Sequence, residues 1–131
     1  MNNRDTKMTL IEKVEHLELY DLVEFSKDNF VRKALTQSKG IVCDFVCFEP
    51  GQDAGLHKHP VQDEIFYVVE GNGTITFEDR DDIPVKAGSI VFTPSGVVHG
   101  VRTNASDRLV LMLIKGPGIT TREARQFIHG N

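Results

Sequence analysis

Three of the five histidines in this chain lie at two places that could do chemistry together. His57 and His59 are separated by a single residue, Glu64 follows shortly after them, and His99 comes later in the chain. Imidazole nitrogens together with a carboxylate oxygen are the ligands that bind borderline divalent cations such as Mn, Fe, Co, Ni, Cu or Zn. These residue types therefore predict a site for one divalent metal ion.

The spacing of the first two histidines favours a β scaffold. Alternate side chains of a strand share one face, so His57 and His59 can reach the same ion from a strand. On a helix, residues two apart lie about 200° apart around the axis and would point away from each other.

Glycines and prolines frame both places at fixed distances. Residues 51–71 read GQDAGLHKHPVQDEIFYVVEG, and residues 88–99 read GSIVFTPSGVVH. These runs resemble the two motifs of the cupin superfamily, G(X)5HXH(X)3-4E(X)6G and G(X)5PXG(X)2H(X)3N. The matching positions are Gly51, His57, His59, Glu64 and Gly71 in the first motif, and Gly88, Pro94, Gly96 and His99 in the second.

The last position of the second motif departs from the family. Thr103 stands where the family has Asn, and Asn104 comes one residue later. That Asn is not a metal ligand in the family, so the predicted site is left intact. The resemblance implies a small single-domain cupin with an all-β fold, the double-stranded β-helix or jelly-roll barrel. It also implies the metal ligands His57, His59, Glu64 and His99, and association into a homodimer.

Short β-prone runs separated by turn residues support the same fold class. We expect strands at residues 22–25, 30–35, 41–48, 65–69, 74–78, 83–86, 89–93, 99–103 and 109–115, with a turn at residues 71–73. The whole chain, residues 1–131, reads as a single domain whose barrel core is residues 41–115. Residues 1–12 read as a polar tail or arm. Thr120 and Glu123 form a capping box that opens a short helix over residues 120–129.

Strand alternation suggests the walls of a cavity beside the metal. Phe66 and Val68 follow on the face of Glu64, and Val101 follows on the face of His99. The last strand offers Leu109, Leu111 and Leu113 or else Val110, Met112 and Ile114, of which we take Leu111 and Leu113 as pocket residues. No Arg, Lys or second carboxylate is placed toward the metal, and no catalytic residue is assigned. A small, partly apolar ligand with a chelating group is therefore expected in preference to a sugar phosphate.

Composition excludes several other classes of protein. The chain has a net charge of -4 and its 15 basic residues are dispersed, so no nucleic-acid partner is expected. No apolar run approaches the roughly 18 residues of a membrane span, and the amino terminus lacks the pattern of a secretory signal. We therefore expect a cytoplasmic protein without a membrane partner.

The two cysteines lie in one expected strand, about 13 Å apart, which is too far for a disulfide. Cys43 and Cys47 are thus either small buried apolar residues or thiols that line the pocket. His16 and His129 lie outside both motifs and are expected to be ordinary surface residues.

Two functions remain open at this point. The complete ligand set favours a metal-dependent enzyme acting on a small molecule, of the dioxygenase, isomerase or lyase type. The lack of an assignable catalytic residue favours a non-catalytic module that binds or senses a metal and a small ligand. The fold hosts many chemistries and does not decide between them.

Overall fold

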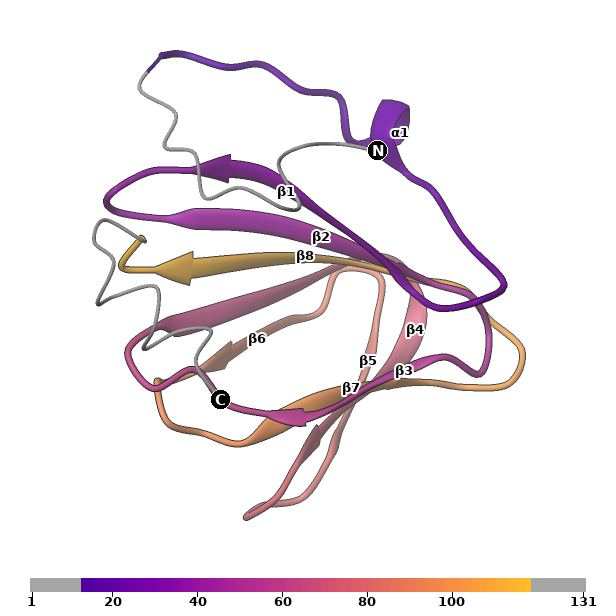
Figure 1. Cartoon of the computed structure of the whole chain (residues 1–131). Helices are drawn as coiled ribbons and strands as arrows, with labels where there is room; N and C mark the ends of the chain where they lie inside the picture. Colours follow the sequence, from indigo (N-terminus) through magenta and orange to yellow (C-terminus); the bar gives the residue numbers. More distant parts are fainter. Residues whose placement is uncertain (1–12, 119–131) are drawn as a thin grey trace.

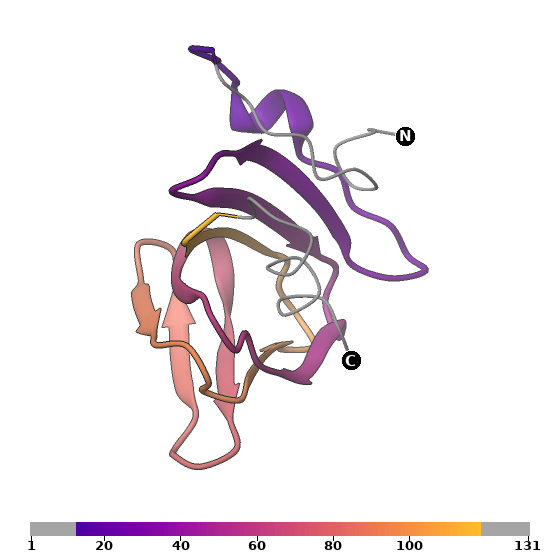
Figure 2. The same cartoon turned by 60° about the vertical axis from the view of Figure 1, so that its left-hand side comes forward.

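Eight antiparallel strands curl into a barrel in this protein (Figures 1 and 2). The structure, a computed structural model, describes residues 13–118, so the expected tail at 1–12 and the expected helix at 120–129 lie outside the described residues. The strands are β1 (Val31–Gln37), β2 (Val42–Phe48), β3 (Asp53–His57), β4 (Asp63–Phe77), β5 (Ile83–Lys86), β6 (Ile90–Thr93), β7 (His99–Thr103) and β8 (Leu109–Gly116). The all-β prediction is confirmed.

The strand order is β1-β2-β8-β4-β7-β3, and both β5 and β6 also pair with β4. β4 thus belongs to two sheets. Its first half pairs with β6 and β8, whereas its second half pairs with β5 and β7. Within residues 13–118, β1 and β3 form the two ends of this order, where β1 pairs with β2 and β3 pairs with β7.

The continuity of β4 corrects the predicted turn at residues 71–73. We expected two strands there, but the chain runs as one strand of 15 residues from Asp63 to Phe77. Gly71 has a φ of 84°, which L side chains rarely adopt, and the register shifts between Val68 and Glu70. The glycines therefore bend the strand from one sheet into the other instead of reversing it.

The glycines of the two motifs share one backbone property. Gly51, Gly71, Gly88 and Gly96 all have φ between 84° and 92°. At Gly71 space is limiting as well, because a Cβ there would lie 1.8 Å from the carbonyl oxygen of Arg108. The glycines that flank the histidines in the sequence thus occupy positions where the backbone turns sharply or where another segment approaches closely.

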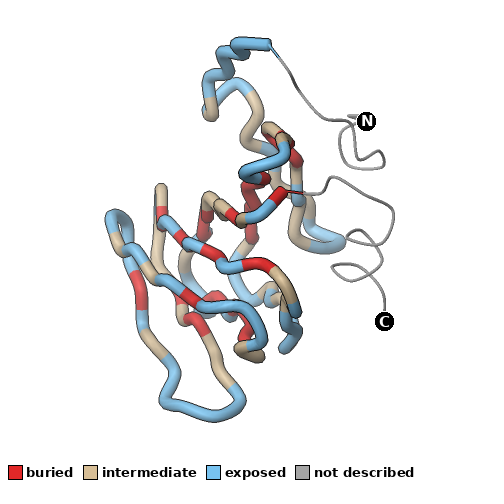
Figure 3. Tube along the Cα trace, turned by 90° about the vertical axis from the view of Figure 1, so that its left-hand side faces the viewer, coloured by how far each residue is buried: buried red, intermediate tan, exposed pale blue. Residues whose placement is uncertain are grey.

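Burial alternates along the first half of β4, whereas most of β2 and the start of β8 are buried on both faces. Figure 3 shows the buried and exposed residues along the chain. The inward face holds the main core, which includes Phe48, Phe66, Ile75, Leu109 and Leu111. Every one of these side chains is at most 2% exposed. This apolar packing stabilises the barrel around the cavity that holds the histidines.

A second core lies on the outer face of β1, β2 and β8. Phe45, Cys47 and Val110 are buried there beneath apolar side chains of the segment before β1. The predicted strand at 22–25 is wrong, because this segment forms the short helix α1 (Leu19–Leu22) and then packs on the sheet without joining it. No helix in the described part of the chain is long and apolar enough to span a bilayer.

Candidate metal centre

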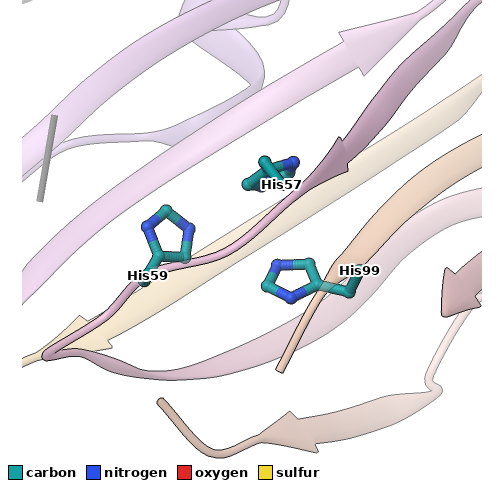
Figure 4. Close-up of side chains that lie close together, drawn as sticks. All are labelled: His57, His59 and His99. Carbon is teal, nitrogen blue, oxygen red and sulfur yellow. The ribbon is translucent and has the colours of Figure 1, made fainter. Parts of the chain in front are cut away.

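The barrel brings the three motif histidines together (Figure 4). His57 is the last residue of β3 and His99 the first residue of β7, and the two are directly paired across these strands. His59 lies two residues beyond the end of β3, in the connection to β4. One ring nitrogen from each of the three lies within 4.8 Å of those of the other two. Atoms so placed can share one cation.

Glu64 approaches two of these rings from β4. Its Oε1 lies 3.0 Å from Nε2 of His99 and 3.3 Å from Nε2 of His59. The Glu64 side chain is only 2% exposed. Glu64 thus lies beside two of the three histidines, whereas the group of mutually close donor atoms comprises His57, His59 and His99.

Backbone carbonyls orient two of the rings. Nδ1 of His57 lies 2.9 Å from the carbonyl oxygen of Gly55, and Nδ1 of His99 lies 2.9 Å from that of Val97. A carbonyl oxygen only accepts, so each neutral ring carries its proton on Nδ1 and leaves Nε2 with a free lone pair. This arrangement is typical of histidines that bind metal ions.

The buried polar atoms of the site fit a cation. Within residues 13–118, Oε1 of Glu64 and Nε2 of His99 are buried and have no hydrogen-bond partner. They lie close enough for an ion pair, but without the alignment of a hydrogen bond. Two facing acceptors left unsatisfied cost free energy. A divalent ion bound to both would remove that cost, so the donor set suits a borderline divalent metal.

Local electrostatics keep the ligands in their metal-binding forms. Burial by itself would raise the pKa of Glu64, but His59, His99 and Lys115 outweigh it and lower the pKa to about 2. Partial burial of the His57 ring lowers its pKa, although the residue lies exposed at the rim. An ionised carboxylate and a neutral imidazole are the forms that ligate.

A cavity of about 320 Å³ adjoins these residues. Phe66, Val101, Leu111 and Leu113, all expected from alternation, line it together with His57, His59 and Glu64. Val68 does not line it, because it lies further along β4 and is packed within the main core. The volume suits a small molecule.

Charged residues that we did not expect also line this cavity. Arg32 of β1 and Lys115 of β8 contribute to its wall. Both bind the carboxylate of Asp44, a residue of β2 that is 2% exposed. The expectation that no basic side chain faces the metal cavity is therefore wrong. Lys115 lies two residues after Leu113 and so shares its face of β8. The sequence could have predicted this only if the inward face of the last strand had been known.

The cysteines face away from the cavity. Cys47 belongs to the outer core beneath the N-terminal segment, and Cys43 packs against the same core. They are small apolar residues in this fold, and burial raises the pKa of the Cys43 thiol to about 11. The described histidine outside the motifs, His16, is exposed and contacts Glu18.

Comparison with known proteins supports the motif resemblance. The family model for the cupin domain matches residues 44–115. An oxalate-binding protein of Thermotoga maritima is 35% identical over 65 residues, which cover 50% of this chain and 53% of that protein. An uncharacterised Bacillus subtilis protein is 40% identical over 47 residues, 36% of this chain and 42% of the relative. The chain spans about half the length of the curated relatives it matches.

Solved structures share the fold. An RmlC-like cupin from Desulfovibrio desulfuricans has a TM-score of 0.73 at 24% identity and covers 82% of this chain and 100% of its own. A Klebsiella pneumoniae protein with a double-stranded β-helix domain has a TM-score of 0.75 at 20% identity, covering 83% and 95%. At these identities the likeness shows the fold alone. Together with the match that spans residues 44–115, it establishes that the chain belongs to the cupin family.

Proposed function

We propose that His57, His59, Glu64 and His99 bind one divalent metal ion, and that this ion binds a small molecule in the adjoining cavity. The observation that carries the proposal is the pair of buried atoms without hydrogen-bond partners, Oε1 of Glu64 and Nε2 of His99, which lie 3.0 Å apart. Four protein ligands leave up to two positions of an octahedral ion for a ligand. Mn, Fe, Co, Ni, Cu and Zn all accept such a donor set.

We favour an enzyme that acts on a small oxygen-bearing molecule, of the dioxygenase, isomerase or lyase type. The metal would supply Lewis-acid or redox chemistry at an oxygen of the substrate. The chain supplies the surroundings. Phe66, Val101 and Leu111 restrict water around the bound molecule, and the ionised Glu64 keeps the site less positive than three histidines alone.

A second candidate is a protein that binds a small acid without turnover. The observation in its favour is the 35% identity to the oxalate-binding protein of Thermotoga maritima. Incubating the metal-loaded protein with oxalate and other small acids separates the two functions. Product formed in excess of protein would indicate the enzyme, whereas stoichiometric binding that leaves the acid intact would indicate the binding protein.

The metal site is tested by elemental analysis of the purified protein and of two variants. His57→Ala and His99→Ala should lose most of the metal while the barrel stays folded, because the ligands lie at strand ends beside a cavity rather than in a closed core. His16→Ala is the matched control, since His16 is an exposed histidine outside the site. Variants that retain as much metal as the parent would refute the assignment.

A further inference from the structure

Two basic side chains that line the cavity, Arg32 and Lys115, share the carboxylate of Asp44, which is buried and does not itself line the cavity. Oδ2 of Asp44 accepts hydrogen bonds from Nζ of Lys115 at 3.0 Å and from a guanidinium nitrogen of Arg32 at 2.5 Å. Burial alone would raise the pKa of Asp44, but Lys115 and Arg32 lower it, so the carboxylate is ionised. Two cations thus share one carboxylate.

Strand register places this cluster beside the metal centre. Lys115 of β8 is the direct cross-strand partner of Glu64, and Arg32 of β1 is the partner of Val46, a residue that lines the cavity. Directly paired residues have Cβ atoms about 5 Å apart. The cluster and the histidines therefore border the same space.

Stability alone is a weak reason for such a cluster. Lys115 is 4% exposed and Asp44 3% exposed. The desolvation of a buried ion pair offsets much of its attraction, and apolar residues of similar volume often stabilise a protein equally well. A role in ligand binding explains the cluster better, because a Lys side chain has three hydrogen-bond donors and an Arg side chain has five, more than one carboxylate oxygen uses. Among residues 13–118, each donates one side-chain hydrogen bond to Asp44.

The charges of the cavity favour an anion once a metal is present. Arg32 and Lys115 carry two positive charges against the carboxylates of Asp44 and Glu64, and as metal ligands Glu64 would be ionised and the histidines neutral. A divalent ion would then add two positive charges that no charged group among the described lining residues compensates, in a cavity whose wall is largely apolar. Uncompensated charge in such surroundings is costly, so a ligand with two negative charges fits best.

We propose that Arg32 and Lys115 form a second anchoring point, which binds a carboxylate of the ligand while the metal binds its other end. The ligand class is a small 2-hydroxy or 2-oxo acid that carries a second carboxylate. The inference rests on the proposed metal site. It adds the chemical identity of the ligand group that lies away from the metal, a second carboxylate. Arg32 and Lys115 set specificity in this arrangement and leave chelation to the metal.

A pair of acids that differ in one group tests this assignment. Malate and 2-hydroxybutanoate have the same chelating end and the same chain length, but malate ends in a carboxylate where the other ends in a methyl group. Calorimetry on the full chain, loaded with whichever of Mn, Ni or Zn binds most tightly, should show malate binding about tenfold tighter or more. Arg32→Met should remove much of this preference. The double variant Asp44→Asn/Lys115→Met should also reduce it, and it avoids leaving one buried charge unpaired.

The controls separate this inference from the metal site. Lys33→Met changes the neighbouring cation of β1, which pairs with Glu24, and should keep the parent's preference. Affinity for 2-hydroxybutanoate and metal content should stay within about twofold of the parent in all variants. Metal-loaded parent protein that binds malate no tighter than 2-hydroxybutanoate would overturn the inference, as would variants that keep the full preference. A parent that binds none of Mn, Fe, Co, Ni, Cu and Zn would instead overturn the proposed function.

Discussion

Glu64 keeps its negative charge in surroundings that would otherwise remove it. The carboxylate is buried, yet two imidazoles and a lysine lower its pKa to about 2. Lys115 favours the ionised carboxylate whatever the state of the rings, whereas His59 and His99 favour it only while a proton lies on the ring nitrogen that faces it. At the proposed metal site, protons therefore compete with the ion at the rings.

Metal affinity should consequently follow the protonation of imidazole. We expect constant affinity above about pH 7 and a progressive loss below about pH 6.5, where free imidazole gains a proton. Burial lowers the pKa of His57, so this ring should stay neutral and able to bind the metal to a lower pH than a free imidazole. Metal titrations between pH 8 and pH 5 check this. Glu64→Gln should weaken binding at all these pH values without moving the midpoint, and flat binding by the parent would contradict histidine ligation.

The buried ion pair gives a prediction for stability. Asp44→Ala leaves Lys115 as a buried cation without its carboxylate, and should lower the free energy of unfolding by about 3–5 kcal/mol. Asp44→Leu combined with Lys115→Met removes both charges and should cost far less than the single change. Urea denaturation of the two variants and the parent measures the difference. Equal losses in both variants would show that the charges are not coupled.

At the residue scale, the sequence predicts which motif side chains meet better than it predicts the rest of the pocket. Fixed spacings bring His57, His59 and His99 into one cluster with Glu64 beside two of them, whereas metal binding by these residues stays a prediction. The position of Lys115 in the cavity wall could not be predicted in the same way. Its place on the inward face depends on the phase of β8, and either phase of that strand presents apolar residues.

At the element scale, the bend in β4 depends on one glycine. Gly71→Ala would place a Cβ 1.8 Å from the carbonyl oxygen of Arg108 at a positive φ, so the backbone must shift and the barrel should be severely destabilised. Gly88→Ala is the matched control, because Gly88 also has a positive φ but open space around it. Gly88→Ala should lower the free energy of unfolding by only about 1–2 kcal/mol. Thermal unfolding of both variants measures this, and similar losses would contradict the steric argument.

At this scale, boundaries were predictable for short strands with turn residues on both sides, and not where one strand passes from one sheet to another. β5 and β7 lie at their expected residues. β4 was expected as two strands, because glycines that bend a strand and glycines that reverse it look alike in sequence. The segment at 22–25 has the apolar side chains of a strand, but it uses them to cover Phe45 and Cys47. Which surface such a segment covers is a tertiary property.

At the scale of the whole molecule, the outer face is covered unevenly. The N-terminal segment covers one part of it, whereas β4 and β6 expose a patch formed by paired apolar residues. In this patch Ile65 lies opposite Phe92 and Tyr67 opposite Ile90, each at least 38% exposed. Exposed apolar residues in contact are typical of surfaces that bind another chain.

We therefore predict a homodimer, which sedimentation of the full chain at micromolar and higher concentrations checks. Changing Ile90 and Phe92 together to Lys should shift the protein toward monomer without loss of metal. Ile41→Lys, which alters an exposed apolar residue in the β1–β2 turn, should leave association unchanged. A parent that stays monomeric throughout would refute the prediction.

The pairing of β3 with β7 also has a consequence for the time course of folding. β4, β5 and β6 lie between these strands in the chain, so His57 and His99 become neighbours only after the chain has closed a long loop. Non-local pairings of this kind are slow to form, on the order of milliseconds to seconds. We therefore expect the site to assemble in a slow step of folding, as does the still less local β2–β8 pairing, so that an ion cannot speed the earlier steps. A bound ion should instead lengthen the lifetime of the folded barrel, by slowing the separation of the two strands that it joins.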